Sequence, residues 1–232
     1  MSAGTLADGL IGYYCFESNA LDSSTLANDG VLFGSPVWQA GAGRPGGTFY
    51  FDGINDHVRA AIPAPYHTSN LTVTAWVKPR TYYHSGEAYM LLSSMRANNI
   101  SGFQMALQPG YALSMDSRTT DGQNLQALAS GVFTQADTNV WKFVAGTVEF
   151  DGSTNTLKAY VDGDVKNSQS FASGPFGYEA DATLFLGINY DSPAAGLGRN
   201  YDREFTGLMD SVRIYNRVLS TNELQTIFRA GF

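Results

Sequence analysis

The chain has 232 residues, a length that suits one large all-β domain or two small ones. Hydrophobic residues make up 44% of the chain, which is enough for a sizeable core and excludes an intrinsically disordered protein. The formal net charge of −7 makes nucleic acid and anionic membranes poor partners, and no apolar run approaches the ~18 residues that a membrane-spanning helix needs.

Short strands separated by turn residues run along most of the sequence. The first, residues 10–16, alternates only loosely, as a strand covered on both faces does, and a polar loop follows at residues 17–30. Asp-Gly pairs, which favour tight hairpin turns, recur through the chain. Further strands are predicted at residues 48–51, 57–60, 71–77, 88–94, 102–107, 112–115, 125–128, 140–150, 156–161, 165–170 and 182–188. This spacing predicts an all-β sandwich or barrel, without a visible domain boundary or internal repeat.

The strand at residues 71–77 shows the clearest alternation. Its odd-numbered residues are all apolar and share one face, whereas the other face carries two threonines and Trp76. Trp76 can belong either to the core or to a binding surface, and we favour the core.

A strand and a helix are predicted near the end of the chain. Residues 205–215 alternate between apolar and polar side chains, except that Asp210 occupies a position where a central strand normally carries an apolar residue. A carboxylate in a sheet needs a partner, and a metal ion is one of the few good ones. Ser220 followed by Glu223 forms a capping box, so a short helix is predicted from this point.

Two loops are longer than a sandwich scaffold requires, at residues 79–89 and 189–203. Both combine tyrosines with Arg, His or Asp, and long loops of this kind in compact domains often carry function. We therefore expect ligand-binding side chains on them.

Several motifs resemble those of a known family. The stretch Gly207-Leu-Met-Asp210-Ser-Val-Arg-Ile-Tyr215 closely resembles the C-terminal signature of laminin-G-like, concanavalin A-like jelly rolls. Further matches occur, in the family's order, at residues 12–17 with 22–24, 51–58, 71–78, 141–147 and 160–163. The resemblance covers nearly the whole chain and implies one domain, residues 1–232. Its fold would be an all-β, two-sheet antiparallel jelly-roll sandwich of the concanavalin A-like type, with one short C-terminal helix.

The resemblance also implies a structural Ca²⁺ site, because in this family the first and last strands are neighbours and often hold the ion. Glu17 and Asp210 would then lie close together. Asp22 in the polar loop is a further candidate ligand, and Asn28 or Gly30 of the same loop would complete the shell of oxygen ligands that Ca²⁺ prefers. The sequence departs from the family pattern at Glu17, where aspartate is more common, and in the loop, which reads Ser23-Ser-Thr. The alternative is that these are ordinary turn residues.

A non-catalytic, lectin-like carbohydrate-binding role is the function that we expect. A sugar presents apolar C–H faces and many hydroxyls, so its site needs an aromatic platform surrounded by polar groups. The two long loops and the adjoining strands supply the candidates Tyr82, Tyr83, His84, Tyr89, Arg96, Gln104, Tyr190, Arg199, Tyr201 and Asp202. The alternative for each tyrosine is that it packs inside its own loop.

Catalytic motifs are incomplete or absent from the sequence. Glucanases of this fold carry two glutamates on one strand, whereas Glu149-Phe-Asp151 lacks the second one. No His-Glu-x-x-His or Gly-x-Ser-x-Gly motif occurs. A polysaccharide lyase built on Tyr82, Tyr83 or His84 is one alternative to the lectin-like role. A protein-adhesion module is another.

The expected partner is a glycan or polysaccharide, with a surface protein as the alternative; neither nucleic acid nor membrane insertion is expected. The resemblance implies an extracellular or cell-surface location in a bacterial-type protein. Met1-Ser-Ala-Gly-Thr lacks the basic start and apolar stretch of a signal peptide, and we interpret Met1 as an artificial start, so this absence does not predict the location.

Overall fold

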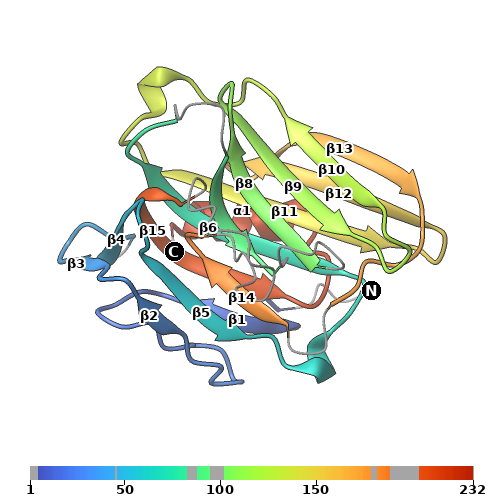
Figure 1. The fold of residues 1–232 in the computed structure, drawn as a ribbon, viewed down its shortest axis with the longest axis horizontal. Coiled ribbons are helices and arrows are strands. Elements are labelled where there is room, and N and C mark those ends of the chain that lie inside the picture. The colour runs from blue at the N-terminus through green and yellow to red at the C-terminus, as the bar shows by residue number, and fades with distance from the viewer. Residues whose placement is uncertain are drawn as a thin grey trace, which may run out of the picture.

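A computed structural model of the protein describes residues 5–44, 46–82, 88–94, 102–178, 182–188 and 204–231. Within these residues the strands form two antiparallel sheets stacked face to face (Figure 1). Sheet A has the order β13 (Asp164–Ala172), β12 (Thr154–Val161), β11 (Lys142–Phe150), β6 (Leu71–Pro79), β15 (Thr206–Tyr215), β4 (Thr48–Asp52) and β3 (Val37–Gln39), with β1 (Leu10–Tyr14) also paired to β15. Sheet B has the order β10 (Asn124–Ala129), β9 (Ala112–Arg118), β8 (Gly102–Gln108), β7 (Tyr89–Ser93), β14 (Thr183–Leu186), β5 (His57–Ala61) and β2 (Val31–Phe33).

The two sheets enclose the main core because their strands point apolar residues inward and polar residues outward. β10 shows the pattern most plainly, since Leu125, Ala127 and Ala129 are buried while Asn124 and Gln126 are exposed. This is the arrangement expected of an antiparallel jelly-roll sandwich, so the predicted fold class is confirmed.

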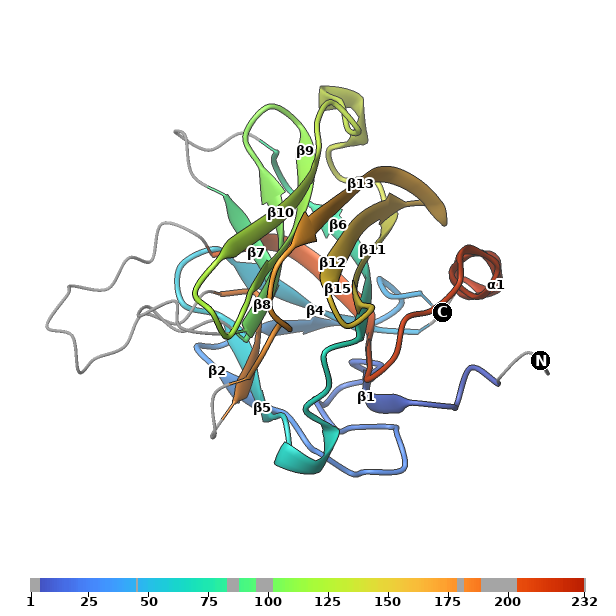
Figure 2. The ribbon, with the colours of Figure 1, turned by 90° about the vertical axis from the view of Figure 1, so that its right-hand side faces the viewer.

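The helix α1 (Thr221–Ala230) covers the outer face of sheet A, the face turned away from sheet B (Figure 2). Ser220 and Glu223 form the predicted capping box, in which the Ser220 N–H donates to Glu223 Oε2 over 2.8 Å. Leu224 and Ile227 are buried in a second apolar cluster that includes Trp76, whose ring centroid lies 5.7 Å from that of Phe228. Trp76 is therefore a buried structural residue, as the sequence predicts, although it lies outside the main core.

The structure departs from the sequence-based prediction mainly at short elements. The sequence predicts neither β2 nor β3, which are three residues long, nor the 3-10 turns η1 (Ala64–Tyr66) and η2 (Gln135–Asp137). β1 ends at Tyr14 rather than at residue 16, because Phe16 adopts a left-handed φ of 54° that ends the extended backbone. Among the residues that the structure describes, no helix has the length and apolar character needed to span a membrane.

Candidate functional site

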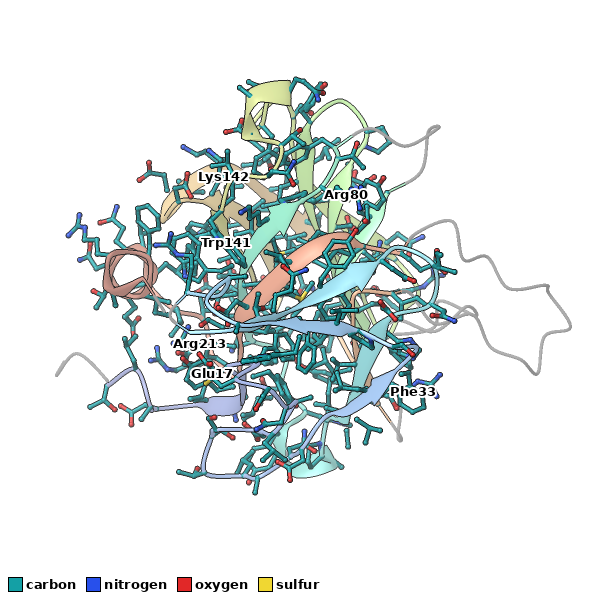
Figure 3. The ribbon with its side chains drawn as sticks, turned by 90° about the vertical axis from the view of Figure 1, so that its left-hand side faces the viewer. Glu17, Phe33, Arg80, Trp141, Lys142 and Arg213 are labelled. Carbon is teal, nitrogen blue, oxygen red and sulfur yellow. The ribbon has the colours of Figure 1, made fainter. Side chains whose placement is uncertain are left out.

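Two acidic residues that are distant in sequence meet at the outer face of sheet A. Glu17 follows β1 (Figure 3), and Asp210 lies in β15, the strand that pairs with β1. The loop between β3 and β4 covers both carboxylates: the Arg44 N–H donates to Asp210 Oδ2, and the Gly47 N–H donates to Glu17 Oε2 over 3.0 Å. A Cβ atom at Gly46 would overlap the Glu17 carboxylate, so this loop must carry glycine where it crosses the acid.

The backbone around the two carboxylates is strained. Phe16 and Ser18, on either side of Glu17, have φ values of 54° and 67°, and Ser211, next to Asp210, has a φ of 49°. A side chain in this left-handed region costs about 1–2 kcal/mol at each residue. The register of β15 against β6 also shifts between Asp210 and Arg213, a bulge that re-aims the Asp210 side chain. Strain and bulges concentrated at one point are typical of functional sites.

The electrostatics of this pair favour a cation. The Asp210 side chain is 1% exposed, and burial raises the pKa of its carboxyl group to about 7, helped by the charge of Glu17 and opposed by hydrogen bonds from the Arg44 and Ser211 amides. Within the described part of the chain, no Lys, Arg or His forms an ion pair with Glu17 or Asp210. Two neighbouring carboxylates, one exposed and one buried, fit a hard divalent cation whose shell is completed by carbonyl oxygens and water.

The structure brings Glu17 and Asp210 together as expected, but it places Asp22 and Asn28 elsewhere. The Asp22 carboxylate closes its own loop by accepting hydrogen bonds from Tyr13 N, Ser24 N, Ser24 Oγ and Asn28 N at 2.7–2.9 Å. The Asn28 side chain donates to the Ala61 carbonyl. These contacts correspond to the turn-residue alternative for Asp22 and Asn28. The described residues contain no group of three or more His, Cys, Asp or Glu arranged for a metal.

Next to the carboxylate pair, sheet A carries a hollow of about 270 Å³ on the same outer face. Its floor lies on neighbouring strands of sheet A: Tyr50 is opposite Leu208, Leu208 is opposite Lys78, and Gln39 of β3 is opposite Thr48 of β4. We call this site the sheet A hollow; its lining residues are Gln39, Tyr50, Lys78, Arg80, Asn139, Gly207 and Leu208.

Hydrogen bonds hold the rim of the sheet A hollow. The Arg80 guanidinium, just beyond the end of β6 (Figure 3), donates to the Tyr50 hydroxyl over 2.8 Å, which fixes a cation beside the edge of an aromatic ring. The Arg80 N–H donates to the Thr206 carbonyl, and the Asn139 N–H donates to the Pro79 carbonyl. Gly207 has a φ of 145°, and a Cβ atom there would overlap the Lys78 carbonyl, so the two strands approach closely only with glycine at this position.

Three of the ligand-binding residues predicted from the sequence lie in the described part of the chain. Tyr82 and Tyr89 are each 5% exposed, so neither presents a ring to solvent, and the Tyr82 ring stacks on Phe133 at 4.9 Å. Gln104 points outward from sheet B, but its amide donates to Asp116 Oδ2 over 3.0 Å. The remaining candidates lie outside the described residues: Tyr83, His84, Arg96, Tyr190, Arg199, Tyr201 and Asp202.

Sequence reasoning missed the sheet A hollow altogether. Its residues come from β3, β4, β6, β15 and the segment before β11, and only the pairing register brings them together. The available signal was weak: Tyr50 and Lys78 occupy outward positions on strands with inward apolar neighbours. Such alternation shows which face a residue occupies but not which strand lies beside it.

Comparison with known proteins identifies the family. The profile Laminin_G_3, described as the concanavalin A-like lectin/glucanases superfamily, matches residues 51–225. The chain belongs to this superfamily. No curated protein sequence gives a significant match.

Solved structures of the concanavalin A-like type share the fold at low sequence identity. The binding domain of Paraclostridial Mosquitocidal Protein 1 has a TM-score of 0.74 at 20% identity, covering 97% of this chain and 52% of that one. The receptor binding domain of botulinum neurotoxin C/D mosaic serotype has a TM-score of 0.71 at 18% identity, with coverages of 97% and 52%. The chain thus spans about half the length of these toxin domains.

A third structure matches over nearly its full length. Domain 4 of AbnA, a GH43 extracellular arabinanase from Geobacillus stearothermophilus, was solved in complex with arabinotriose. Its TM-score is 0.67 at 19% identity, and the match covers 94% of this chain and 97% of that domain. Similarity at this level of identity establishes the shared fold alone.

Proposed function

We propose that this protein is a non-catalytic carbohydrate-binding module and that the sheet A hollow is a glycan-binding site. The observation that carries the proposal is the combination, within one hollow, of the Tyr50 ring, the apolar Leu208 side chain and the polar groups of Gln39, Lys78 and Asn139. An apolar surface for C–H groups, bordered by donors and acceptors for hydroxyls, is the chemistry that a sugar ring requires.

The lining of the hollow suits binding rather than catalysis. All seven lining residues are described, and none of them is Asp, Glu or His. Hydrolysis of a glycosidic bond requires a pair of carboxyl groups, one of which protonates the leaving group. The hollow therefore offers an aromatic ring, amides and cations, but neither the acid nor the base of a glycosidase.

We also propose that Glu17 and Asp210 hold one structural Ca²⁺. When bound, the ion would neutralise the two neighbouring carboxylates and tie β1 and β15 to the β3–β4 loop. Glu17, Asp210 and backbone carbonyls of that loop are the groups that would hold it. The burial of Asp210 beside a second acid, without a Lys, Arg or His ion pair among the described residues, and the strained backbone around both acids support this assignment.

A location outside the cell or on its surface fits this role, and a related fold solved with arabinotriose agrees with glycan binding. A protein-adhesion module is the second candidate. One observation favours it: large apolar side chains are exposed along the edge strands β2 and β3 and the β4–β5 turn, namely Val31, Leu32, Val37, Trp38 and Ile54.

A glycan array read with the purified domain in millimolar Ca²⁺ and again in EDTA tests the function. We expect hits that are lost in Tyr50→Ala and retained in Tyr111→Ala, a matched tyrosine in the β8–β9 turn of sheet B. Tyr50→Phe should keep much of the binding, because it removes the hydroxyl but not the ring. Hits that are unaffected by Tyr50→Ala would move the site away from the hollow, and an empty array would favour adhesion.

A further inference from the structure

We infer that the saccharide bound in the sheet A hollow is anionic and carries carboxylate or sulfate groups. This inference rests on the proposed glycan-binding function and adds the class of ligand. It follows from the charges that line the hollow and from their partners.

Cations gather at the hollow in a chain that is acidic as a whole. The sequence contains 21 Asp and Glu against 14 Lys and Arg, yet the seven lining residues include Lys78 and Arg80 and no acid. Lys78 lies in β6 and Arg80 directly follows the end of that strand, and both side chains line the hollow. The hollow is thus a local positive site on a negative protein, which can attract an anion despite the net charge.

The charges of Lys78 and Arg80 are not compensated within the described residues. No ion pair joins either of them to an Asp or Glu, whereas Lys142 pairs with Asp137 at 2.7 Å and Arg217 pairs with Glu223 at 2.7 Å. The one side-chain hydrogen bond that these residues give Arg80 runs to the neutral Tyr50 hydroxyl. Among the described residues, two cations without an acidic partner therefore border one hollow.

The hollow also presents the cations in a useful arrangement. Because Arg80 is bonded to the Tyr50 hydroxyl, its guanidinium is held beside the ring on which a sugar would rest. A guanidinium offers a planar pair of donors that matches a carboxylate or a sulfate, and the Lys78 ammonium adds a second charge on the Leu208 side. A volume of about 270 Å³ lies near the lower end of the ~300–1,000 Å³ typical of small-molecule sites, so one or two sugar units would fill it.

Two matched pairs of ligands test the inference by isothermal titration with the intact domain. Oligogalacturonate and its methyl ester share a sugar and differ in carboxylate charge, and dextran sulfate and dextran differ in sulfate. We expect at least one anionic member to bind at least about tenfold more tightly than its neutral partner. The pair that responds identifies the carboxylate or the sulfate as the recognised group.

Charge-neutralising variants locate the effect in the hollow. Lys78→Gln and Arg80→Gln should each weaken binding of the anionic ligand about tenfold, whereas Lys166→Gln, on the edge strand β13 across sheet A, should leave it unchanged. Raising the salt concentration from ~0.05 to ~0.5 M should weaken binding of the wild-type protein and have less effect on the double variant Lys78→Gln/Arg80→Gln.

The outcomes separate this inference from the proposed function. Equal binding of charged and neutral members, lost in Tyr50→Ala but not in Lys78→Gln or Arg80→Gln, would overturn the anionic inference and leave glycan binding standing. Anionic binding that Lys166→Gln weakens as much as Arg80→Gln would show diffuse charge attraction and would also overturn it. No binding of any saccharide, on the array or by titration, would overturn both proposals.

Discussion

The Asp210 carboxyl group is almost fully buried, and it lies beside the second acid of the carboxylate pair. An isolated buried carboxylate is unfavourable, so the folded protein must either protonate Asp210 or neutralise it with a cation. These two responses differ in their dependence on pH and on Ca²⁺. Measuring the stability of the intact domain against pH, with and without Ca²⁺, therefore distinguishes protonation of Asp210 from cation binding.

The pH dependence of unfolding should show the buried acid directly. Burial raises the pKa of Asp210 from 3.8 to about 7, so between these values the folded state holds a proton that the unfolded state has released. Without metal, this group makes the free energy of unfolding fall as pH rises through that window, by at most about 1.4 kcal/mol per pH unit.

Calcium bound at the proposed site should reverse this loss of stability, because a metal ion takes deprotonated carboxylates as its ligands. Urea titrations from pH 4 to 8 measure the free energy of unfolding in EDTA and in Ca²⁺. The increase in this free energy that Ca²⁺ causes should grow as the pH approaches 7. A gain that is equal at pH 5 and pH 8 would show that Asp210 does not bind the ion.

Glu17→Gln tests the partner acid without removing a hydrogen-bond acceptor. The amide oxygen can still accept from the Gly47 N–H, but the charge that would help to bind Ca²⁺ is gone. We expect the rise in Tm caused by millimolar Ca²⁺ to shrink strongly in Glu17→Gln and to persist in Glu149→Gln, a matched exposed glutamate on β11. The same rise in both variants, measured by calorimetry, would place the ion elsewhere.

At the scale of elements, the stability of the β3–β4 loop should depend more on the glycine at position 46 than on the glycine at position 41. Gly46 and Gly41 both have left-handed φ values, of 81° and 68°, but a Cβ atom at Gly46 would overlap the Glu17 carboxylate whereas one at Gly41 meets nothing within 4 Å. Both substitutions to alanine add backbone strain of about 1–2 kcal/mol. Gly46→Ala should therefore lower the Tm measured without metal more than Gly41→Ala does. Of the two variants, only Gly46→Ala should reduce the rise in Tm that Ca²⁺ causes. Equal effects would mean that the loop moves freely over the acid.

The sequence reveals elements well where the signal is local. The Ser220–Glu223 capping box places α1, and the isolated Asp210 in an apolar strand marks the acid site, since both features depend on residues close in sequence. β2 and β3 escape prediction because three residues are too few to show a period. Tyr82 shows a different limit: the composition of a loop does not reveal whether a ring packs inward, and this ring is buried against Phe133.

The sheet A hollow is a property of the whole molecule. Its floor requires β3, β4, β15 and β6 to pair in one register, and no local pattern specifies that register between segments so far apart. The acidic chain as a whole disfavours anionic partners, while the arrangement of Lys78 and Arg80 favours one at this point. Net charge is therefore a guide to solubility and nonspecific binding, and the local field decides what the site accepts.

The expected relation between the proposed metal site and the proposed glycan site follows from this architecture. Tyr50 and Lys78 lie on strands of sheet A, and Arg80 directly follows one, whereas the metal would tie down the β3–β4 loop beside them. Removing Ca²⁺ should therefore lower Tm by several degrees, since roughly 2–4 °C corresponds to 1 kcal/mol at this chain length. At 25 °C, well below unfolding, it should change the affinity for an anionic oligosaccharide by less than about twofold. Titrations in Ca²⁺ and in EDTA, with circular dichroism to verify the fold, measure this. A site formed by strand residues needs no metal ion to contact its ligand. If the domain stays folded in EDTA but loses binding, the ion must contact the ligand itself, and the proposed separation of the two sites would be wrong.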